Sequence, residues 1–222
     1  YDFVGPEFTA TLDRLGLLVS RMGQAQGRDR WGYVGGIRFW TSLVWEHEAV
    51  RNYDVIMRID TDSCFKGPSA KEVDSYLPSI PPQYVFRSNG PYLGSNVWVK
   101  GLYDFAVQYI EKEEIEPLNP ELWSYIQQAH EKHQTMPVFQ KNFEVMRKSF
   151  FKRYDVMKWH KALTEGEPYG VLRYRWGEGQ TSVLTMALFG TKDNILMTRH
   201  EGYSHGRGVC AEYVGVKSGW EV

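Results

Sequence analysis

The feature that most constrains this chain is a short apolar run that ends in two acidic residues. Val55–Ile59 is rich in β-branched and aliphatic side chains, a composition typical of a buried strand. Asp60 and Asp62 follow directly, separated by Thr61. Because side chains alternate along a strand, the two carboxylates share one face if the extended conformation continues through Thr61.

Two acids at the C-terminal end of a buried strand lie where α/β sheets commonly bind ligands. Carboxylates held this close repel each other, and a divalent cation that also contacts a phosphate group would offset the repulsion. A structural alternative is that both acids accept backbone hydrogen bonds in a turn after the strand. The pattern Asp-x-Asp is short, and its place after a predicted strand makes a metal site about as well supported as the turn.

Helical and strand patterns alternate along the rest of the chain. Apolar spacing predicts helices near residues 8–22, 41–50, 70–76, 102–110, 120–133, 146–163 and 183–188, and strands near 84–86 and 195–197. Residues 31–36 are aromatic and glycine-rich and could let the backbone approach a ligand, but they lack the spacing of a phosphate-binding loop. Residues 138–145 are expected to form a strand or loop that leads to the site. This order predicts one α/β domain with a mixed sheet flanked by helices.

Composition narrows the possible functions. The 222 residues carry a net charge of −1, which does not favour nucleic acid or an anionic membrane as a partner. Eight Trp and 14 Tyr could stack on sugars or simply fill the core. Cys64 and Cys210 could pair or stay free. No apolar run is long enough to span a membrane, and because the chain opens on Tyr1 we expect it to be a piece of a longer protein.

Several other polar residues have both a functional and a structural interpretation. Glu144 precedes a predicted helix and could complement the helix dipole, and Glu178 could cap one. His205 lies in an irregular tail and could be a surface residue or a Mn²⁺ ligand beside carboxylates. Arg38 and Arg58 could bind phosphate or pair with acids, and pairing is the commoner outcome.

Several of these stretches, in the same order, resemble the fungal-type α-1,2-mannosyltransferases of the Kre2/Mnt1 group (glycosyltransferase family 15). The similarity covers about residues 33–210. The matching stretches are Arg38-Phe39-Trp40-Thr41, Tyr53, Arg58-Ile59-Asp60-Thr61-Asp62, Gln140-Lys141-Asn142-Phe143-Glu144-Val145, Tyr174-Arg175-Trp176-Gly177-Glu178-Gly179-Gln180 and Arg199-His200-Glu201-Gly202-Tyr203-Ser204-His205, with Cys210 following.

The resemblance implies a GT-A-like fold, GDP-mannose as donor, Mn²⁺ as cofactor and retention of anomeric configuration. The acceptor would be a mannose-containing glycan or glycoprotein. The full-length protein would act in the Golgi lumen as a type II membrane protein, although this segment would not contact the membrane. Residues 1–222 would then be one catalytic domain that lacks the upstream part of the nucleotide-binding region.

The resemblance also implies a role for each matched residue. Asp60, Asp62 and His205 would hold Mn²⁺. Glu144 would lie at the β face of the donor C1, as a nucleophile or as a stabiliser of an oxocarbenium ion, and Glu178 would bind the acceptor. The residues expected to contact the sugar nucleotide are Tyr33, Arg38, Asp62 and Arg175.

Several positions depart from the family pattern, among them Asp60, which replaces a Glu, Glu178, which replaces an Asp, Gln180, which replaces a Pro, and Ser204, which replaces one of two paired histidines. Lys141 stands where the family pattern has a Ser. Two other functions therefore stay open. A haloacid-dehalogenase-type phosphohydrolase would use Asp60 as its nucleophile, but no Asp-Asp pair follows Asp62. A non-catalytic glycan-binding module would explain the aromatic content and the missing upstream region.

Overall fold

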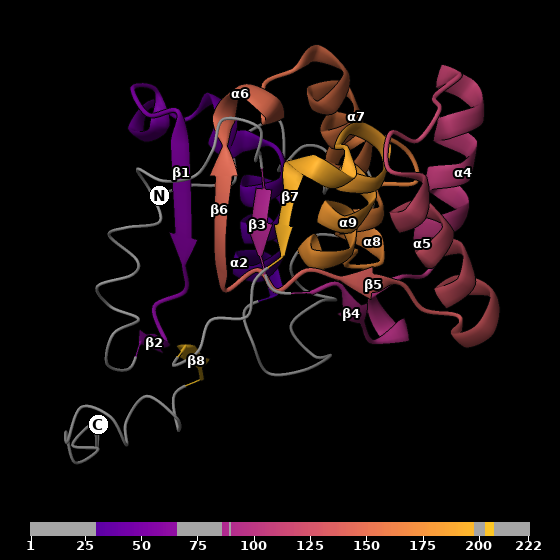
Figure 1. Ribbon diagram of the computed structural model, residues 1–222, viewed down its shortest axis with the longest axis horizontal. Coiled ribbons are helices and arrows are strands. Elements are labelled where there is room, and N and C mark those ends of the chain that lie inside the picture. The colour runs from indigo at the N-terminus through magenta and orange to yellow at the C-terminus, as the bar shows by residue number, and fades with distance from the viewer. Residues whose placement is uncertain (1–29, 66–85, 89, 198–202, 207–222) are drawn as a thin grey trace.

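The computed structural model describes residues 30–65, 86–88, 90–197 and 203–206, and its centre is a mixed four-stranded sheet (Figure 1). The strand order is β1 (Val55–Ile59), β6 (Phe143–Arg147), β3 (Phe86–Ser88) and β7 (Ile195–Met197). β6 runs antiparallel to both β1 and β3, whereas β3 and β7 are parallel. Within the β1–β6 pair, Arg58 lies directly opposite Glu144.

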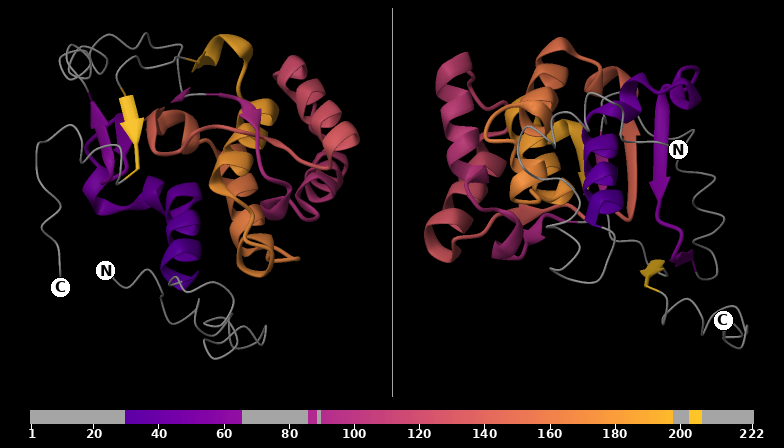
Figure 2. Two further views of the ribbon diagram at one scale, coloured as in Figure 1. Left: turned by 90° about the horizontal axis from the view of Figure 1, so that it is seen from below. Right: turned by 180° about the vertical axis from the view of Figure 1, so that it is seen from behind.

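Helix α9 (Glu178–Phe189) is the central helix of the molecule. Its sequence from Gly179 to Phe189 holds no charged residue, and it is buried on nearly all sides, as expected for a helix without a polar face. It packs against α2 (Arg30–Thr41), α5 (Pro120–His133) and α7 (Tyr154–Glu165). In Figure 1, α9, α5 and α4 (Leu102–Glu113) lie beyond the β7 edge, and Figure 2 shows α2 against the sheet from behind.

The outer helices are amphipathic. Leu102, Ala106 and Tyr109 are the buried residues of α4, and their spacing of four and three residues places them on one face. In α5, the Asn119 side chain accepts a hydrogen bond from Leu122 N at 3.1 Å and Pro120 occupies the first turn, so the helix begins where its sequence predicts.

Two short ribbons form separate two-stranded sheets. β2 (Ser63–Phe65) pairs with β8 (Tyr203–His205), and β4 (Tyr92–Leu93) pairs with β5 (Pro137–Val138). The remaining elements are the 3-10 turns η2 (Leu43–Glu46), η3 (Glu48–Val50), η4 (Asn96–Trp98) and η5 (Lys192–Asn194) and the short helices α6 (Lys148–Phe151) and α8 (Gly170–Arg173).

The mixed α/β architecture and the strand at 55–59 are confirmed. The expectation that this strand is buried was wrong, because β1 is the edge strand of the described four-stranded sheet, where Ile56 and Arg58 are buried but Ile59 is exposed. The helices expected at 102–110, 120–133 and 183–188 and the strand at 195–197 are confirmed as well. The strand expected at 84–86 begins at Phe86 among the described residues. The helices expected at 8–22 and 70–76 lie outside the described residues.

Two local expectations were wrong, and one stretch without a predicted element is helical. The glycine-rich residues 31–36 belong to α2, where Val34 and Ile37 bury one face of the helix. The helix expected at 41–50 is two 3-10 turns. The helix expected at 146–163 is two helices, α6 and α7, and the first begins only at Lys148. Met146 instead pairs with Ile56 in β1 and with Phe86 in β3, so sheet pairing overrides the helical pattern there.

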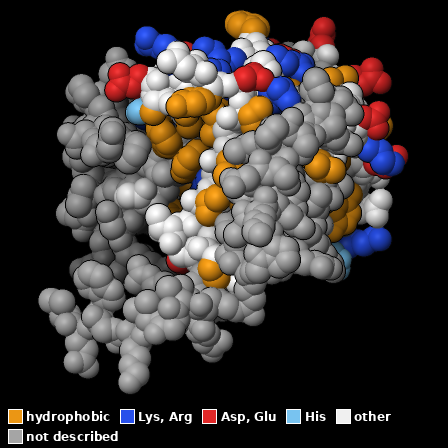
Figure 3. Space-filling view, turned by 60° about the vertical axis from the view of Figure 1, so that its left-hand side comes forward, with side chains coloured by type: hydrophobic (Ala, Val, Ile, Leu, Met, Phe, Trp, Pro, Cys, Tyr) orange, Lys and Arg blue, Asp and Glu red, His pale blue; other side chains and the backbone are white. Residues whose placement is uncertain are grey.

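The surface shows no strong separation of charge on the face in Figure 3, where Lys, Arg, Asp and Glu side chains mix along the upper and right-hand edges. This mixing agrees with the net charge of −1. Across the described ranges, no helix has the length and apolar character that crossing a membrane requires.

Candidate active site

An open cleft of about 450 Å³ lies at the end of β1, beside the start of α9. Segments from across the chain contribute to it, including α2, η4, the β5–β6 loop and β8. The residues that line it are Tyr33, Asp60, Tyr92, Trp98, Val138, Phe139, Gln140, Lys141, Asn142, Arg175, Gly177, Glu178, Gly179, Gln180 and His205.

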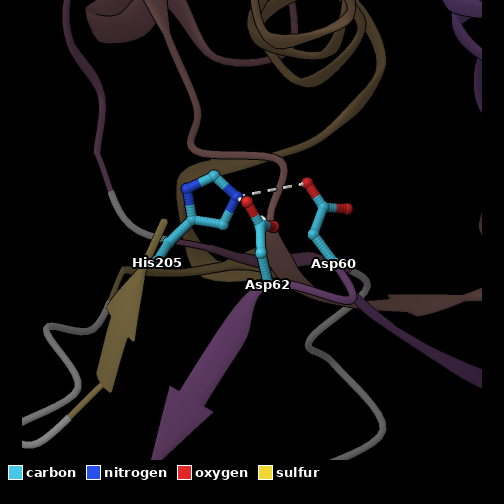
Figure 4. Close-up of side chains that lie close together, drawn as sticks. All are labelled: Asp60, Asp62 and His205. Carbon is cyan, nitrogen blue, oxygen red and sulfur yellow. Dashed lines mark ion pairs between the residues drawn. The ribbon is translucent and has the colours of Figure 1, made fainter. Parts of the chain in front are cut away.

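Asp60, Asp62 and His205 form a group that can hold a metal ion (Figure 4). One ligand atom from each side chain lies within 4.8 Å of the other two. His205 Nε2 is 2.9 Å from Asp62 Oδ1 and 3.7 Å from Asp60 Oδ2. All three side chains are about one-third exposed, so the ligand atoms remain open to solvent and to a substrate in the cleft.

The backbone brings the two acids together through a turn. The condition for the two acids to share a strand face is not met, because the chain turns at Thr61 and Asp62 before β2 begins. Asp60 O accepts a hydrogen bond from Ser63 N at 3.0 Å, and Asp60 N donates to Asn142 O at 2.9 Å. The turn interpretation and the metal interpretation are therefore compatible at this strand end.

β8 brings His205 to the acids from the far end of the chain. Ser63 is paired with His205 across the β2–β8 ribbon, and Gly206 N donates to Asp62 O at 3.0 Å. Cys64, in the same ribbon, is disulfide-bonded, while Cys210 lies outside the described residues. The ribbon thus fixes the imidazole beside the strand end.

Arg58 connects the acids of the site. Its guanidinium binds Glu178 through two hydrogen bonds, of 2.8 and 3.0 Å, and donates to Asp60 Oδ1 at 3.2 Å. The Trp40 ring lies 4.7 Å from the guanidinium carbon. Burial alone would lower the pKa of Arg58, but the hydrogen bonds and charge of Glu178, with smaller contributions from the other acids, raise it. Arg58 therefore pairs with acids, which is the commoner of its two predicted roles.

Glu144 lies beneath the cleft rather than in its lining. Its side chain is 0% exposed, and its Oε2 contacts the ammonium of Lys141, which does line the cleft. Its Oε1 is 3.7 Å from Arg58 Nη1 and has no hydrogen-bond partner among the described residues. Burial raises the pKa of Glu144, and the cations Lys141 and Arg58 oppose that effect only in part.

Glu178 reaches the cleft because α9 starts close to the β5–β6 loop. Gly179 allows this approach, since a Cβ at that position would lie 2.7 Å from the carbonyl oxygen of Phe139, which is too close for an ordinary contact. Phe139 N also donates to Gly179 O at 3.3 Å. The loop and the helix start therefore fix Glu178 next to Arg58.

Arg175 forms a second cationic feature of the cleft. Its guanidinium carbon is 4.1 Å from the centre of the Tyr33 ring and 3.9 Å from that of the Trp98 ring. The backbone at Arg175 is left-handed, with φ of 58°, a costly conformation for a residue that is not glycine. No acid among the described residues pairs with it, so the edge of the guanidinium can donate to a ligand.

The structure brings most of the predicted site residues together. Tyr33, Asp60, Arg175, Glu178 and His205 line the cleft, and Asp62 completes the metal-binding group. Glu144 is separated from the cleft by Lys141, as described above.

Arg38, like Glu144 and Asp62, is not part of the cleft lining. Its Nη2 pairs with Glu165 Oε1 of α7 at 2.7 Å.

Sequence reasoning missed Lys141, Trp98 and Tyr92. Lys141 lies inside a matched stretch, but the family pattern has a serine there, so the resemblance gave no signal for a cation. Trp98 and Tyr92 lie in a region without a matched motif, where only the high aromatic content pointed to ligand-binding rings. The core interpretation holds for Trp159 and Trp176, which are fully buried.

Comparison with known structures supports this architecture. The fold is similar to that of core-mannan synthase A (CmsA/Ktr4) from Aspergillus fumigatus in its Mn/GDP form, with a TM-score of 0.65 and 17% identity over 90% of this chain and 52% of that chain. The mannosyltransferase Ktr4p from S. cerevisiae gives a TM-score of 0.63 and 16% identity over 92% of this chain and 51% of that one.

A complex of Ktr4p with GDP gives a TM-score of 0.62 and 15% identity, over 90% of this chain and 60% of that chain. This chain thus spans about half the length of the first two of these structures. No curated protein sequence matches it.

At the level of sequence families, a profile described as "Glycolipid 2-alpha-mannosyltransferase" matches residues 22–216. This match spans nearly the whole chain and agrees with the resemblance to the Kre2/Mnt1 group and with the GT-A-like fold of the structural neighbours. The chain therefore belongs to the glycolipid 2-alpha-mannosyltransferase family, glycosyltransferase family 15.

Proposed function

We propose that this protein is a retaining α-1,2-mannosyltransferase that moves mannose from GDP-mannose to a mannose-containing glycan with Mn²⁺ as cofactor. The observation that carries the proposal is the position of the metal-binding group. Asp60 and His205 open onto the same cleft as Glu178 and Arg175. A cleft that combines metal ligands, a free cationic edge and a carboxylate suits a sugar diphosphate and its acceptor.

The donor set of Asp60, Asp62 and His205 fits Mn²⁺. Two carboxylates and one imidazole are ligands that this ion accepts, and the three ligand atoms already lie within 4.8 Å of one another. Bound there, Mn²⁺ would supply charge that offsets the negative charge on the departing diphosphate. The Mn/GDP form of core-mannan synthase A supports the choice of metal and nucleotide.

The remaining residues of the cleft would bind and orient the substrates. Arg175, held between Tyr33 and Trp98, presents the edge of its guanidinium to phosphate or sugar oxygens. Tyr33 is 50% exposed, so part of its ring can also cover the apolar face of a sugar. Glu178, fixed by Arg58, would accept hydrogen bonds from hydroxyl groups of the acceptor.

Glu144 would act at C1 of the donor sugar, the carbon at which transfer takes place. A carboxylate near C1 of the donor can act as a nucleophile or can stabilise positive charge on the sugar ring during same-face attack. Either role needs Glu144 ionised and needs the cleft wall at Lys141 to let the sugar approach.

From the family alone, we also propose that the full-length protein works in the Golgi lumen as a type II membrane protein.

The test is a pair of measurements on wild type and on Glu144→Gln. Calorimetric titration with GDP-mannose, with and without Mn²⁺, should show metal-dependent binding for both proteins. A mannose-transfer assay should show product for wild type and none for Glu144→Gln. Near-normal transfer by the variant would remove Glu144 from the catalytic machinery.

The same titration, run beside a phosphoester-hydrolysis assay and a glycan-binding assay, separates the mannosyltransferase from a phosphohydrolase and from a glycan-binding module. Release of phosphate from a generic phosphoester, without metal-dependent GDP-mannose binding, would support the phosphohydrolase. Binding of a mannose-containing glycan, again without metal-dependent nucleotide binding, would support a glycan-binding module.

A further inference from the structure

The buried carboxylate of Glu144 depends on very few partners. Its side chain is 0% exposed, so water does not solvate its charge. In the part of the chain that the structure describes, Lys141 is the residue that donates a hydrogen bond to it, at Oε2. A buried carboxylate with so few donors is costly to ionise.

The positive charge of Arg58 alone does not neutralise the acids around it. It hydrogen-bonds Glu178 and Asp60 but lies 3.7 Å from Glu144 Oε1. Glu144, Glu178 and Asp60 together carry three negative charges when ionised, against the single positive charge of Arg58. Lys141 adds a second positive charge, and its contact is with Glu144 itself.

Lys141 also forms part of the wall between two spaces. It lines the cleft and, on its other side, an internal cavity of about 10 Å³. Its ammonium donates to Ser182 Oγ of α9 at 3.0 Å in addition to contacting Glu144. The lysine therefore links the cleft, the buried carboxylate and the central helix.

We propose that Lys141 is a positioning residue, which keeps Glu144 negatively charged and holds its side chain in place beneath the cleft. The catalytic part of this inference rests on the proposed function, because it matters for mannose transfer only if Glu144 acts on the donor. The charge of Glu144 itself can be measured without any assay of transfer.

The other charged groups near this pair are few among the described residues. Arg58 from β1 opposes protonation of Glu144, whereas the negative charge of Glu178 at the start of α9 favours it. His160 from α7 lines the internal cavity, and burial, with a smaller effect of Lys141, lowers its pKa to about 3. His160 is therefore neutral at working pH, which leaves Lys141 as the cation whose removal changes Glu144 most.

The direct test measures ionisation of Glu144 by NMR on protein labelled with ¹³C at the glutamate carboxyl. The signal that disappears in Glu144→Gln identifies the residue. Replacing Lys141 by methionine keeps most of the apolar stem and removes the ammonium. The titration midpoint of Glu144 should then move to higher pH, and Lys141→Arg should restore it most of the way.

The kinetic test uses the same variants in the transfer assay. Lys141→Met should lower kcat at pH 7 by about tenfold or more, since a charge-assisted hydrogen bond is worth at least that factor. KM for GDP-mannose should change little, and the acidic limb of the pH–rate profile should move to higher pH. A purely structural role for Lys141 would not move that limb.

Two further variants serve as matched controls. Ser182→Ala removes the second hydrogen bond of the Lys141 ammonium without touching Glu144, so it should shift the midpoint in the same direction by a smaller amount. Lys148→Met removes an ammonium that binds the carbonyls of Val50 and Arg51. It should leave the midpoint of Glu144 unchanged.

Each outcome decides between explanations. An unchanged Glu144 midpoint in Lys141→Met overturns the inference, whatever the transfer assay shows. Higher activity in that variant also overturns it, because it would mean that Lys141 blocks the carboxylate. If wild type transfers no mannose while the midpoint moves as expected, the proposed function fails and the control of Glu144 by Lys141 stands.

Discussion

Replacing Arg58 by methionine tests the electrostatic centre of the site. The guanidinium is 9% exposed and lies next to Asp60, Glu144 and Glu178. Removing one partner from a buried ion pair costs about 3–5 kcal/mol, because the remaining charge stays buried without compensation. For a domain of this size each kcal/mol lowers Tm by about 2–4 °C, so we expect a fall of about 6–20 °C.

Arg147→Met is the matched control. Arg147 lies on β6 and pairs with Asp54 at 2.6 Å across the same two strands, but that aspartate is 59% exposed. An exposed ion pair contributes about 0–1 kcal/mol, so this variant should melt close to wild type. Thermal unfolding followed by circular dichroism at pH 7 measures both.

The loss of stability in Arg58→Met should also depend on pH and should be smaller at acidic pH. Burial already raises the pKa of Glu144 in the folded state, and Arg58 opposes this. Removing Arg58 therefore raises it further. An acid whose folded-state pKa is raised binds more protons when folded, so its contribution to stability is present below the unfolded pKa and is lost as pH rises through the folded pKa. The difference from wild type should shrink toward acidic pH.

Arg58 would not be the electrostatic centre of the site if Arg58→Met melted no lower than Arg147→Met at pH 7. A difference that grew on acidification would contradict the assigned role of Glu144.

Three further predictions concern the metal group, the start of α9 and the core. Asp62→Asn should abolish Mn²⁺-dependent binding of GDP in a calorimetric titration while leaving Tm in the absence of metal close to wild type, because Asp62 is about one-third exposed. Gly179→Ala should cost about 1–3 kcal/mol in chemical denaturation and lower transfer activity, because its Cβ would lie 2.7 Å from Phe139 O and displace the start of α9. Burial lowers the pKa of His160 to about 3, so its ring signals should not titrate by NMR between pH 5 and 8. Since the unfolded state binds that proton more readily, this residue should reduce stability as pH falls from about 6.5 toward 3.

Some of this structure could be predicted from the sequence because local patterns and tertiary contacts agree. The β-branched run at 55–59 forms a strand, and Asn119-Pro120 starts a helix. The pattern failed at Met146, where apolar spacing resembles a helix but pairing with β1 and β3 decides the conformation. Residues 31–36 gave no helical pattern, although buried side chains such as Val34 and Ile37 outweigh the cost of three glycines in α2.

In the candidate site too, the sequence predicts some features and tertiary contacts decide the others. Its acids and His205 could be found from spacing and from the family resemblance, because these residues carry recognisable chemistry. The arrangement of charges could not be predicted in this way, because it depends on which side chains meet across strands. The contact of Lys141 with Glu144 and the two hydrogen bonds between Arg58 and Glu178 join segments whose proximity only the fold sets.

Formation of the β2–β8 ribbon and binding of a metal ion to Asp60, Asp62 and His205 should be thermodynamically linked. Two ligands of the metal-binding group precede β2, and the third is in β8, near the other end of the chain. An ion that binds the assembled group and not the unfolded chain adds about 2.7 kcal/mol of stability at a concentration of 100 Kd. A divalent ion that binds this group should therefore raise Tm as its concentration rises, because Asp60, Asp62 and His205 come together only when the β2–β8 ribbon is formed.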